Sequence, residues 1–374
     1  MLFLPEGSQD ETGEILDNKA TTSAIFREIA QARNFKAIAT PVVEYATTFT
    51  NKHVGMKLHR MLKWFNRDGE IEVLRVDWTT AIARALMKQQ SPQTKWFYEG
   101  SVFRNDKDGI ESKQAGIEII RTEAFLGEVE SLLTAVAYLK ELGISNYLIE
   151  LGHTGIFDEI VASLNLDEAD TKKLREAMHD KRRDIVYEIA LAHGTEKQVT
   201  QLTQLVDAYG SVTELRNYQS IWKDNPKLTK ILDHLIELAN LLEQSGVDEV
   251  IIDLGRVKNL PYYSGTMFRG YVKTDGETCF SGGRYDKLYE QFDEKISAVG
   301  LAFDVDVLAK HLQQVQAKPH ICILADSKTH VQAEQLRASY SNAVVDIQYE
   351  QVAAEQYDKI VTVDDEIIFS KIGD

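Results

Sequence analysis

The sequence predicts an α+β fold: an antiparallel sheet flanked by helices, with a helical insertion and a small α/β module at the C-terminal end. Three observations support this prediction. Strand-like segments follow each other through tight turns, as at residues 66–69 (NRDG) and 275–276 (DG), which are typical of β-hairpins. Residues 155–245 carry apolar side chains at helical spacing and show no strand signal. Residues 318–374 alternate strand, helix and strand, which is typical of a separate α/β unit.

These changes of pattern divide the chain into four segments. Its 374 residues are enough for two or three domains. We expect the first part of the core in residues 1–154 and the second part in residues 248–316. A helical insertion over residues 155–247 would separate them, and the C-terminal module would occupy residues 317–374. That module holds five Lys or Arg and ten Asp or Glu, a net charge of 5 − 10 = −5.

The first elements expected are a helix and a strand. The helix covers residues 18–33, with Ile25 and Ile29 on one apolar stripe. The strand covers residues 35–44 and contains Pro41. Proline cannot donate a hydrogen bond to a sheet, so we expect this strand at an edge or an interface.

Asp77 and Thr79 stand where a strand gives way to a helix at residues 81–87. Short polar side chains at this position often cap the N-terminus of a helix. The same side chains could face a ligand, and the pattern leaves both interpretations open.

A hairpin over residues 97–121 offers the most distinctive pattern in the chain. Side chains of a strand alternate between its two faces. Gln114, Gly116 and Glu118 therefore point to one face, and Ile117 points to the other. Glycine permits close approach of a ligand, and the flanking amide and carboxylate offer donors and acceptors.

Arg104, near the end of the first strand of this hairpin, adds a fixed cation suited to a carboxylate or a phosphate. A solvated antiparallel hairpin would show the same alternation without binding anything. The pattern alone does not choose between these two interpretations.

A second polar cluster follows the helical insertion. Tyr262 and Tyr263 precede a Ser-Gly pair and bring rings and hydroxyls near a backbone that a ligand can approach. If both lie in a strand, they point to opposite faces, so at most one should enter a given pocket. The glycines at 282–283 lack the spacing of a dinucleotide fingerprint or a P-loop, and we expect no cofactor.

Composition excludes several functional classes. The chain holds 42 Lys or Arg and 58 Asp or Glu, and its net charge of −16 argues against a broad nucleic-acid footprint. No apolar run approaches membrane-spanning length. Cys279 and Cys322 match no metal or redox spacing, so we expect no metal site and a reduced, cytoplasmic location.

Five segments of the chain, in their order along the sequence, resemble the class II aminoacyl-tRNA synthetase core, and within it histidyl-tRNA synthetase, over about residues 4–312. The resemblance implies a class II synthetase-like sheet and a homodimer formed through the first helix and strand. The matching segments are the helix and strand ending at Pro41, residues 74–79, residues 103–118, residues 262–266 and residues 282–286.

The resemblance also implies a binding site for L-histidine. Asp77 and Glu118 would take its ammonium and imidazole sides, and Arg104 its carboxylate. The residues carried over to this site are Asp77, Thr79, Arg104, Gln114, Glu118, Tyr262 and Tyr263.

Departures from the synthetase pattern point away from its reaction. Val307 stands where that family has an Arg that holds ATP phosphates. Lys258 replaces the family's catalytic Arg, and Lys lacks the bidentate guanidinium fork. Pro261 replaces an Asp, and Asp106 replaces a Glu. Histidine-recognition residues thus remain, while residues for adenylation and tRNA binding are lost.

That combination resembles the regulatory subunits of ATP phosphoribosyltransferase. The resemblance implies a non-catalytic protein that assembles with the short-form catalytic subunit as a hetero-octamer of four plus four. It would be required for the first step of L-histidine biosynthesis and would participate in feedback inhibition by histidine. The alternatives are a divergent histidyl-tRNA synthetase and a synthetase-like histidine sensor with another partner.

Overall fold

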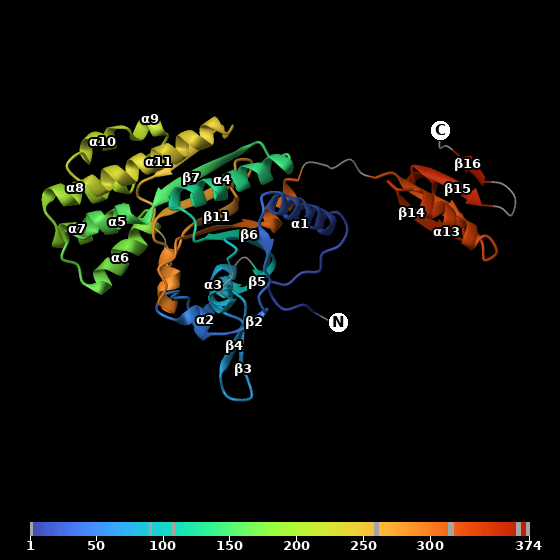
Figure 1. Ribbon diagram of the computed structural model, residues 1–374, viewed down its shortest axis with the longest axis horizontal. Helices are drawn as coiled ribbons and strands as arrows, with labels where there is room; N and C mark the ends of the chain where they lie inside the picture. Colours follow the sequence, from blue (N-terminus) through green and yellow to red (C-terminus); the bar gives the residue numbers. More distant parts are fainter. Residues whose placement is uncertain are drawn as a thin grey trace. The chain divides into compact units, whose positions relative to one another are not determined.

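A computed structural model describes residues 3–89, 92–106, 109–257, 262–312, 318–363 and 368–371. The chain forms two compact units, Met1–Leu312 and Gln313–Asp374 (Figure 1). Each unit is described by itself below.

The helices of the first unit are α1 (Glu14–Ala32), α2 (Thr47–Thr50), α3 (Trp78–Gln89), α4 (Ala124–Glu141), α5 (Thr154–Val161), α6 (Glu168–His179), α7 (Arg183–His193), α8 (Glu196–Leu205), α9 (Val212–Leu215), α10 (Asn217–Ile221), α11 (Pro226–Gln244), α12 (Val305–Lys310) and the 3-10 helices η1 (Leu58–Arg60) and η2 (Asp286–Phe292). Its strands are β1 (Lys36–Ala37), β2 (Val43–Tyr45), β3 (Lys63–Phe65), β4 (Ile71–Leu74), β5 (Lys95–Asp106), β6 (Gly109–Ile120), β7 (Tyr147–His153), β8 (Tyr209–Gly210), β9 (Val250–Asp253), β10 (Thr266–Val272), β11 (Thr278–Arg284) and β12 (Ala298–Asp304).

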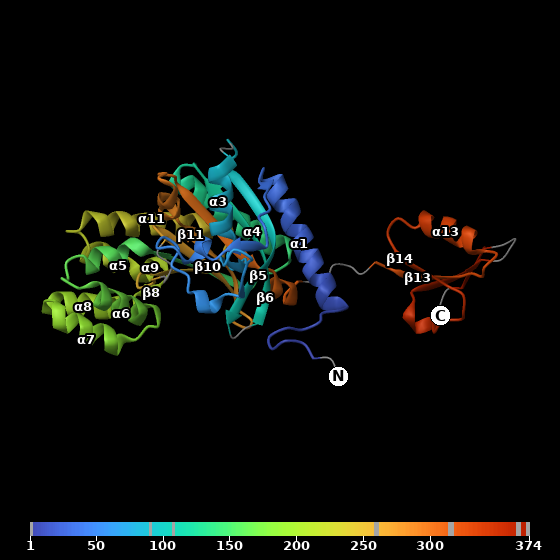
Figure 2. The same cartoon turned by 90° about the horizontal axis from the view of Figure 1, so that it is seen from below.

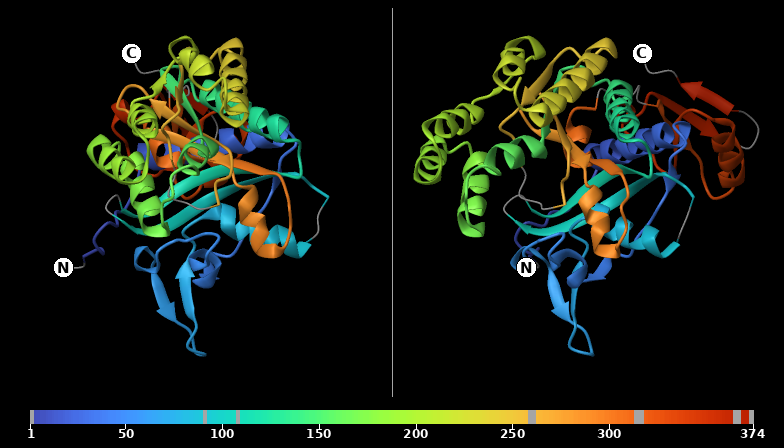
Figure 3. Two further views of the ribbon diagram at one scale, coloured as in Figure 1. Left: turned by 90° about the vertical axis from the view of Figure 1, so that its left-hand side faces the viewer. Right: turned by 60° about the vertical axis from the view of Figure 1, so that its left-hand side comes forward.

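A nine-stranded sheet with the order β1-β5-β6-β12-β11-β10-β7-β9-β8 forms the centre of the first unit. Most neighbouring strands are antiparallel, and the pairs β1–β5 and β7–β9 are parallel. Helices α1, α4 and α11 cover one face of this sheet, whereas α3 lies on the other side (Figures 1 and 3). The α+β class predicted from the sequence is confirmed.

The two faces of β6 differ as the alternation of its residues predicts. Ala115, Ile117 and Ile119 are buried in the main hydrophobic core beneath the covering helices. Gln114, Gly116 and Glu118 point to the opposite face, which the long helices leave free. The sheet therefore presents a polar floor on the side of α3.

The polypeptide between β7 and β9 contains helices α5 to α11 (Figure 2). Leu174, Leu202 and Leu235, from three of these helices, are fully buried in the same hydrophobic core as the sheet. The expectation that this region lacks strands is wrong at one point, because β8 pairs with β9 at the edge of the sheet. Two residues are too few to show alternation.

The strand expected over residues 35–44 is divided into β1 and β2, which belong to different sheets. Pro41 lies between them and not inside a strand. The guanidinium of Arg75 lies at this break, where its Nη1 donates to the carbonyls of Thr40 and Pro41 at 3.0 and 3.2 Å. β2 then joins β4 and β3 in a small three-stranded sheet.

The second unit contains β13 (His320–Leu324), α13 (His330–Ser339), β14 (Val344–Gln348), η3 (Ala354–Gln356), β15 (Lys359–Val363) and β16 (Ile368–Lys371). Its sheet has the order β14-β13-β15-β16, and the first three strands are mutually parallel. Ile323, Ala333 and Val363 form its small core. Within the described parts of the whole chain, none of the helices has the length and apolar character to span a membrane.

Candidate functional site

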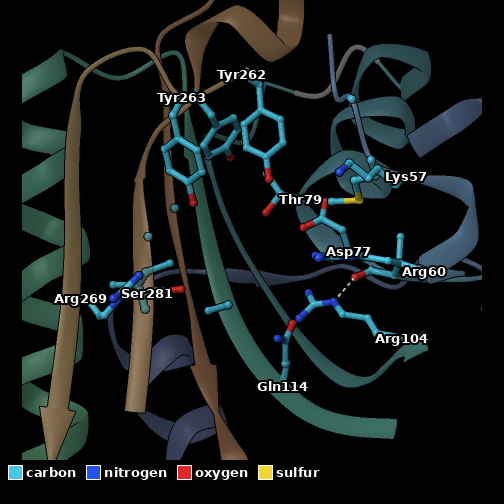
Figure 4. A pocket seen from close by; sticks show the side chains of 18 of the residues that line it. Lys57, Arg60, Asp77, Thr79, Arg104, Gln114, Tyr262, Tyr263, Arg269 and Ser281 are labelled. Carbon is cyan, nitrogen blue, oxygen red and sulfur yellow. Dashed lines mark hydrogen bonds between the residues drawn. The ribbon is translucent and has the colours of Figure 1, made fainter. Parts of the chain in front are cut away.

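A cavity of about 710 Å³ opens on the polar face of the large sheet. Residues from β6, β10, β11 and β12 form its floor, and residues from α3, η1 and α6 form its walls (Figure 4). Of the seven residues expected to bind histidine, six line this one cavity: Asp77, Thr79, Arg104, Gln114, Tyr262 and Tyr263. Segments far apart in the sequence therefore meet here.

Asp77 and Thr79 lie at the N-terminus of α3, on the cavity wall. Asp77 Oδ1 accepts a hydrogen bond from the backbone N–H of Thr80 at 2.7 Å. Asp77 therefore caps the helix, and both Asp77 and Thr79 also line the cavity. The cap fixes the carboxylate in place before any ligand arrives.

Glu118 lies beneath the cavity lining and is almost fully buried. Thr79 Oγ1 donates to Glu118 Oε1 at 2.6 Å, and the Tyr285 hydroxyl donates to Glu118 Oε2. Burial raises the pKa of the Glu118 carboxyl to about 8, and the hydrogen bonds from Thr79 and Tyr285 lower it by less. The carboxyl is thus mainly protonated at neutral pH and holds two lining residues.

Gly300 on β12 makes room for this carboxyl. A Cβ built at Gly300 would meet Glu118 Oε2 at 1.9 Å and the carbonyl oxygen of Ile117 at 2.6 Å. Gly116 plays a similar part for Tyr98, whose ring lies 2.3 Å from a Cβ built there. The glycines of the floor therefore have steric roles that the sequence did not reveal.

Tyr262 and Tyr263 both line the cavity, so the expectation that only one can enter it is wrong. They lie in a turn before β10 and not in a strand, and strand alternation does not apply to them. Their rings are stacked, with centroids 5.1 Å apart. Together they form one aromatic wall (Figure 4).

Arg104 and Gln114 come from the paired strands β5 and β6. Arg104 Nε donates to the carbonyl of Val76 at 3.0 Å, which leaves the rest of its guanidinium directed along the cavity (Figure 4). Both side chains border the cavity, and their hairpin is paired with further strands inside the large sheet.

The tyrosine turn is held by the residues around Tyr285. Ser264 N–H donates to the Arg284 carbonyl at 3.0 Å, and Asp286 N–H donates to Ser264 Oγ at 2.9 Å. Arg284 Nη2 donates to Asp286 at 2.7 Å. The hydrogen bonds of residues 284–286 thus position both Tyr285 and the turn that carries Tyr262.

A buried ionic cluster links this region to α11. Glu128 on α4 is almost fully buried and accepts from Thr266 Oγ1 at 3.0 Å. His234 Nε2 on α11 lies 2.7 Å from the same carboxylate, and Arg284 Nη1 lies 3.5 Å from its other oxygen. Sequence reasoning missed this cluster because its members come from four separate elements.

Arg75 is a second structural residue that sequence reasoning missed. Its guanidinium lies 3.4 Å from the centroid of the Trp78 ring and donates to the Ser101 carbonyl at 2.9 Å. Burial lowers the pKa of Arg75 to about 10, so the group stays charged at neutral pH. It joins the first strands to the helix that carries Thr79.

Comparison with known proteins assigns the fold and the family. A family model described as histidyl-tRNA synthetase matches residues 13–308. An ATP phosphoribosyltransferase regulatory subunit from Clostridium botulinum is 33% identical over 317 residues, covering 81% of this chain and 74% of that protein. One from Caldanaerobacter subterraneus is 30% identical over 322 residues, covering 84% of each. This chain belongs to the family of ATP phosphoribosyltransferase regulatory subunits.

Solved structures agree with the fold of this regulatory-subunit family. A Bacillus halodurans protein described as an ATP phosphoribosyltransferase regulatory subunit/histidyl-tRNA synthetase superposes with a TM-score of 0.84. It is 23% identical, and the match covers 97% of this chain and 98% of that one. Histidyl-tRNA synthetase from Nostoc sp. superposes with a TM-score of 0.78 at 15% identity, covering 97% and 92%.

Two of the four departures from the synthetase pattern, Val307 and Asp106, lie within the described residues. Val307 lies on α12, where its side chain packs partly buried against the main core and its N–H donates to Asp304 Oδ1 at 3.0 Å. Asp106 ends β5. Lys258 and Pro261 lie outside the described residues. In this member of the regulatory-subunit family, the helix position expected to hold ATP phosphates thus carries an apolar side chain.

Proposed function

We propose that this chain is the non-catalytic regulatory subunit of an ATP phosphoribosyltransferase, acting in the first step of L-histidine biosynthesis, and that its cavity binds L-histidine as a feedback signal. The observation that carries the proposal is the joint placement of the recognition residues. Six of them line one cavity and Glu118 supports two of its lining residues, while Val307 supplies no charge for a nucleotide.

Histidine offers three polar groups, and the cavity offers a partner for each. The Asp77 carboxylate suits the ammonium group, and the Arg104 guanidinium suits the carboxylate. The imidazole meets Gln114 and the hydroxyl of Thr79, whose orientation Glu118 fixes. A charge-assisted hydrogen bond of this kind contributes about 1.5–3 kcal/mol.

Calorimetry with histidine tests the binding proposal. We expect Gln114→Ala and Glu118→Ala each to weaken histidine binding at least about tenfold, because each removes a hydrogen-bonding group or its support. Gln335→Ala serves as the control, since that exposed glutamine lies on α13 in the second unit. Unchanged affinity in both cavity variants would show that histidine binds elsewhere.

The assembly forms the second part of the proposal. We infer a homodimer through residues 25–44 and docking onto the short-form catalytic subunit, as a hetero-octamer of four plus four in the cytoplasm. Val42 and Val43 at the end of that region, and Tyr45 directly after it, support the dimer because these apolar side chains are exposed. Histidine would then shift the complex towards a less active state by about 1–3 kcal/mol of coupling.

Reconstitution with the catalytic subunit tests the assembly. The phosphoribosyltransferase rate is measured with the catalytic subunit alone, with this chain added, and with histidine added to both. We expect an increase on addition of the chain and a decrease with histidine. If the chain neither raises the rate nor co-elutes with the catalytic subunit, a histidine sensor with another partner becomes the better explanation.

A divergent histidyl-tRNA synthetase is distinguished by two further measurements. Histidine-dependent pyrophosphate exchange should be absent, because Val307 cannot pair with ATP phosphates. Electrophoretic mobility shift at about 0.1 M salt, where the Debye length is about 10 Å, should show no tight binding of histidine tRNA. The net charge of −16 supports this expectation.

A further inference from the structure

A buried carboxylate on α4 collects partners from three other elements. Glu128 is almost fully buried. Its Oε2 lies 2.7 Å from His234 Nε2 on α11 and accepts from Thr266 Oγ1 on β10 at 3.0 Å, and its Oε1 lies 3.5 Å from Arg284 Nη1 on β11. A buried charge is stable only while its partners are in place. This carboxylate therefore ties α11 to the two strands that it contacts.

Two of these partners support the tyrosine turn, residues 262–265. Thr266 directly follows the turn. Arg284 packs against its backbone, since a Cβ built at Gly265 would meet Arg284 Cδ at 2.8 Å. The carbonyl of Arg284 also accepts from the N–H of Ser264 at 3.0 Å. The groups that neutralise the buried carboxylate are thus the same groups that hold the aromatic wall of the cavity.

His234 connects the helical insertion to this carboxylate. It lies on α11, whose apolar face, including Leu232 and Leu235, is fully buried in the main core. The His234 ring also meets the ring of Phe125 on α4 edge-on, with centroids 5.7 Å apart. α11 lies beside α4 over the same face of the sheet (Figures 1 and 3). The insertion therefore reaches Glu128 through a polar side chain set among apolar ones.

A displacement of α11 would change the environment of the tyrosine turn. Moving the helix away removes the His234 hydrogen bond from Glu128. Thr266 and Arg284 would then have to neutralise the carboxylate without it, and hydrogen bonds to a charged group are strong enough to draw such partners into a new geometry. Because both partners adjoin the turn, its two tyrosines would shift with them.

We propose that His234 is a positioning residue for the cavity: through Glu128 it holds the tyrosine turn in place and makes the affinity for histidine depend on the position of α11. The proposal rests on the histidine-binding function proposed above and adds a means by which the helical insertion regulates that site. Linkage requires the reverse effect as well, so bound histidine strengthens the attachment of α11. The stability of the insertion thus reports whether the cavity is occupied.

Two substitutions that differ mainly in reach test the role of His234. Glutamine places its amide nitrogen close to the position of the imidazole Nε2, so His234→Gln should keep the hydrogen bond to Glu128 and weaken histidine binding by less than about threefold. The amide of His234→Asn is one methylene shorter and falls short of the carboxylate, so histidine binding should weaken at least about tenfold. Calorimetry on the full chain measures both affinities.

His193 supplies the matched control. It pairs with Asp170 at 3.2 Å between α7 and α6, neither residue lines the cavity, and its side chain is 32% exposed against 26% for His234. His193→Asn should change histidine affinity by less than about twofold. In a double-mutant cycle, His234→Asn should have little further effect once Glu128→Gln has removed the buried charge.

Hydrogen exchange separates a positioning role from a general loss of stability. The amides of Ser264 and Asp286 donate the hydrogen bonds that hold the turn. Without histidine, His234→Asn should speed the exchange of these two amides at least about fivefold and leave the amides of α1 unchanged. With histidine, exchange in α11 should become slower in the original protein and not in His234→Asn.

The proposal is overturned if His234→Asn and His193→Asn have equal effects on histidine affinity. It is also overturned if His234→Asn leaves the exchange of Ser264 and Asp286 unchanged, or speeds the exchange of α1 equally. If the original protein binds no histidine, the proposed function fails, and the exchange of these two amides still decides whether His234 holds the turn.

Discussion

The two ends of the cavity satisfy their polar groups in different ways. One end, named here the tyrosine end, is formed by Tyr98, Tyr262, Tyr263 and Tyr285. There Thr79 and Tyr285 are hydrogen-bonded to the buried carboxyl of Glu118, and the rings of Tyr262 and Tyr263 are stacked on each other. The other end, named here the cationic end, is lined by Lys57, Arg60, Arg104, Lys172, Arg175 and Arg269. Within the described residues, Arg175 forms an ion pair with Asp158 and the other five have no carboxylate partner. Hydrogen bonds and ring stacking fix the side chains of the tyrosine end in the folded protein. The positive side chains of the cationic end interact mainly through long-range electrostatic repulsion. Substitutions and salt should therefore affect them differently.

Gly300→Ala should have the largest effect, because it fills the space that the Glu118 carboxyl occupies. We expect a loss of about 3 kcal/mol in the free energy of unfolding, at the upper end of overpacking costs, together with a loss of histidine binding. Urea denaturation and calorimetry measure the two effects.

Gly69→Ala is the control for this substitution. Gly69 has a φ of 83° in the turn between β3 and β4, and nothing lies within 4 Å of an added Cβ. Its cost should be limited to backbone strain of about 1 kcal/mol. Equal destabilisation in both variants would show that Gly300 has no special steric role at the tyrosine end.

Glu118→Gln should change how stability depends on pH. The folded pKa of about 8 lies above the reference value of 4.5, so between these values the folded state binds more protons than the unfolded state. Stability contributed by Glu118 is therefore present at low pH and is lost as pH rises towards 8. From pH 5.5 to 7.5 this loss amounts to about 2–3 kcal/mol.

The glutamine variant cannot ionise, so this pH-dependent loss should disappear from it. Urea midpoints of both proteins at several pH values between 5.5 and 8.5 provide the measurement. The expected result is a flatter profile for the variant. A variant that loses stability with rising pH as steeply as the original protein would mean that Glu118 is already ionised in the folded state.

Added salt should produce the smallest change, which we expect in the affinity for histidine at the tyrosine end. The Debye length falls from about 10 Å at 0.1 M to about 3 Å at 1 M. Histidine affinity should change less than about twofold, because its contacts are enclosed and hydrogen-bonded. Calorimetry at both salt concentrations tests this, and a loss of about tenfold in histidine affinity at 1 M salt would show that long-range charge governs histidine binding.

The features predicted from the sequence are those encoded locally. The hairpin signals located β3–β4 and β10–β11, and alternation placed Ile117 in the core and Gln114 on the opposite face. Motif resemblance supplied Tyr262 and Tyr263 of the tyrosine end, and it did not single out Tyr98 or Tyr285 as site residues. Alternation misled at Tyr262 and Tyr263 because it was applied to a turn.

The cationic end could not be predicted from local patterns. Lys172 has the spacing and neighbours of an ordinary exposed helix residue, and Arg60 stands just before the hairpin formed by β3 and β4. Their meeting with Arg269 depends on how α6, η1 and β10 are packed. Likewise, Gly300 reads as a small residue in a strand until the Glu118 carboxyl is placed against it.

The pairing of β6 with β12 joins residues that lie far apart in the sequence, which affects how this protein can fold. Residue 298 pairs with residue 120, and residue 250 pairs with residue 149. The helices between these strands can form from local contacts. The strands themselves can pair only after long loops have closed, which is slower. We therefore expect the cavity floor to be completed late in folding, after the helices that border it. A ligand that spans β6 and β12 should leave the folding rate nearly unchanged and slow unfolding, which prolongs the lifetime of the native state.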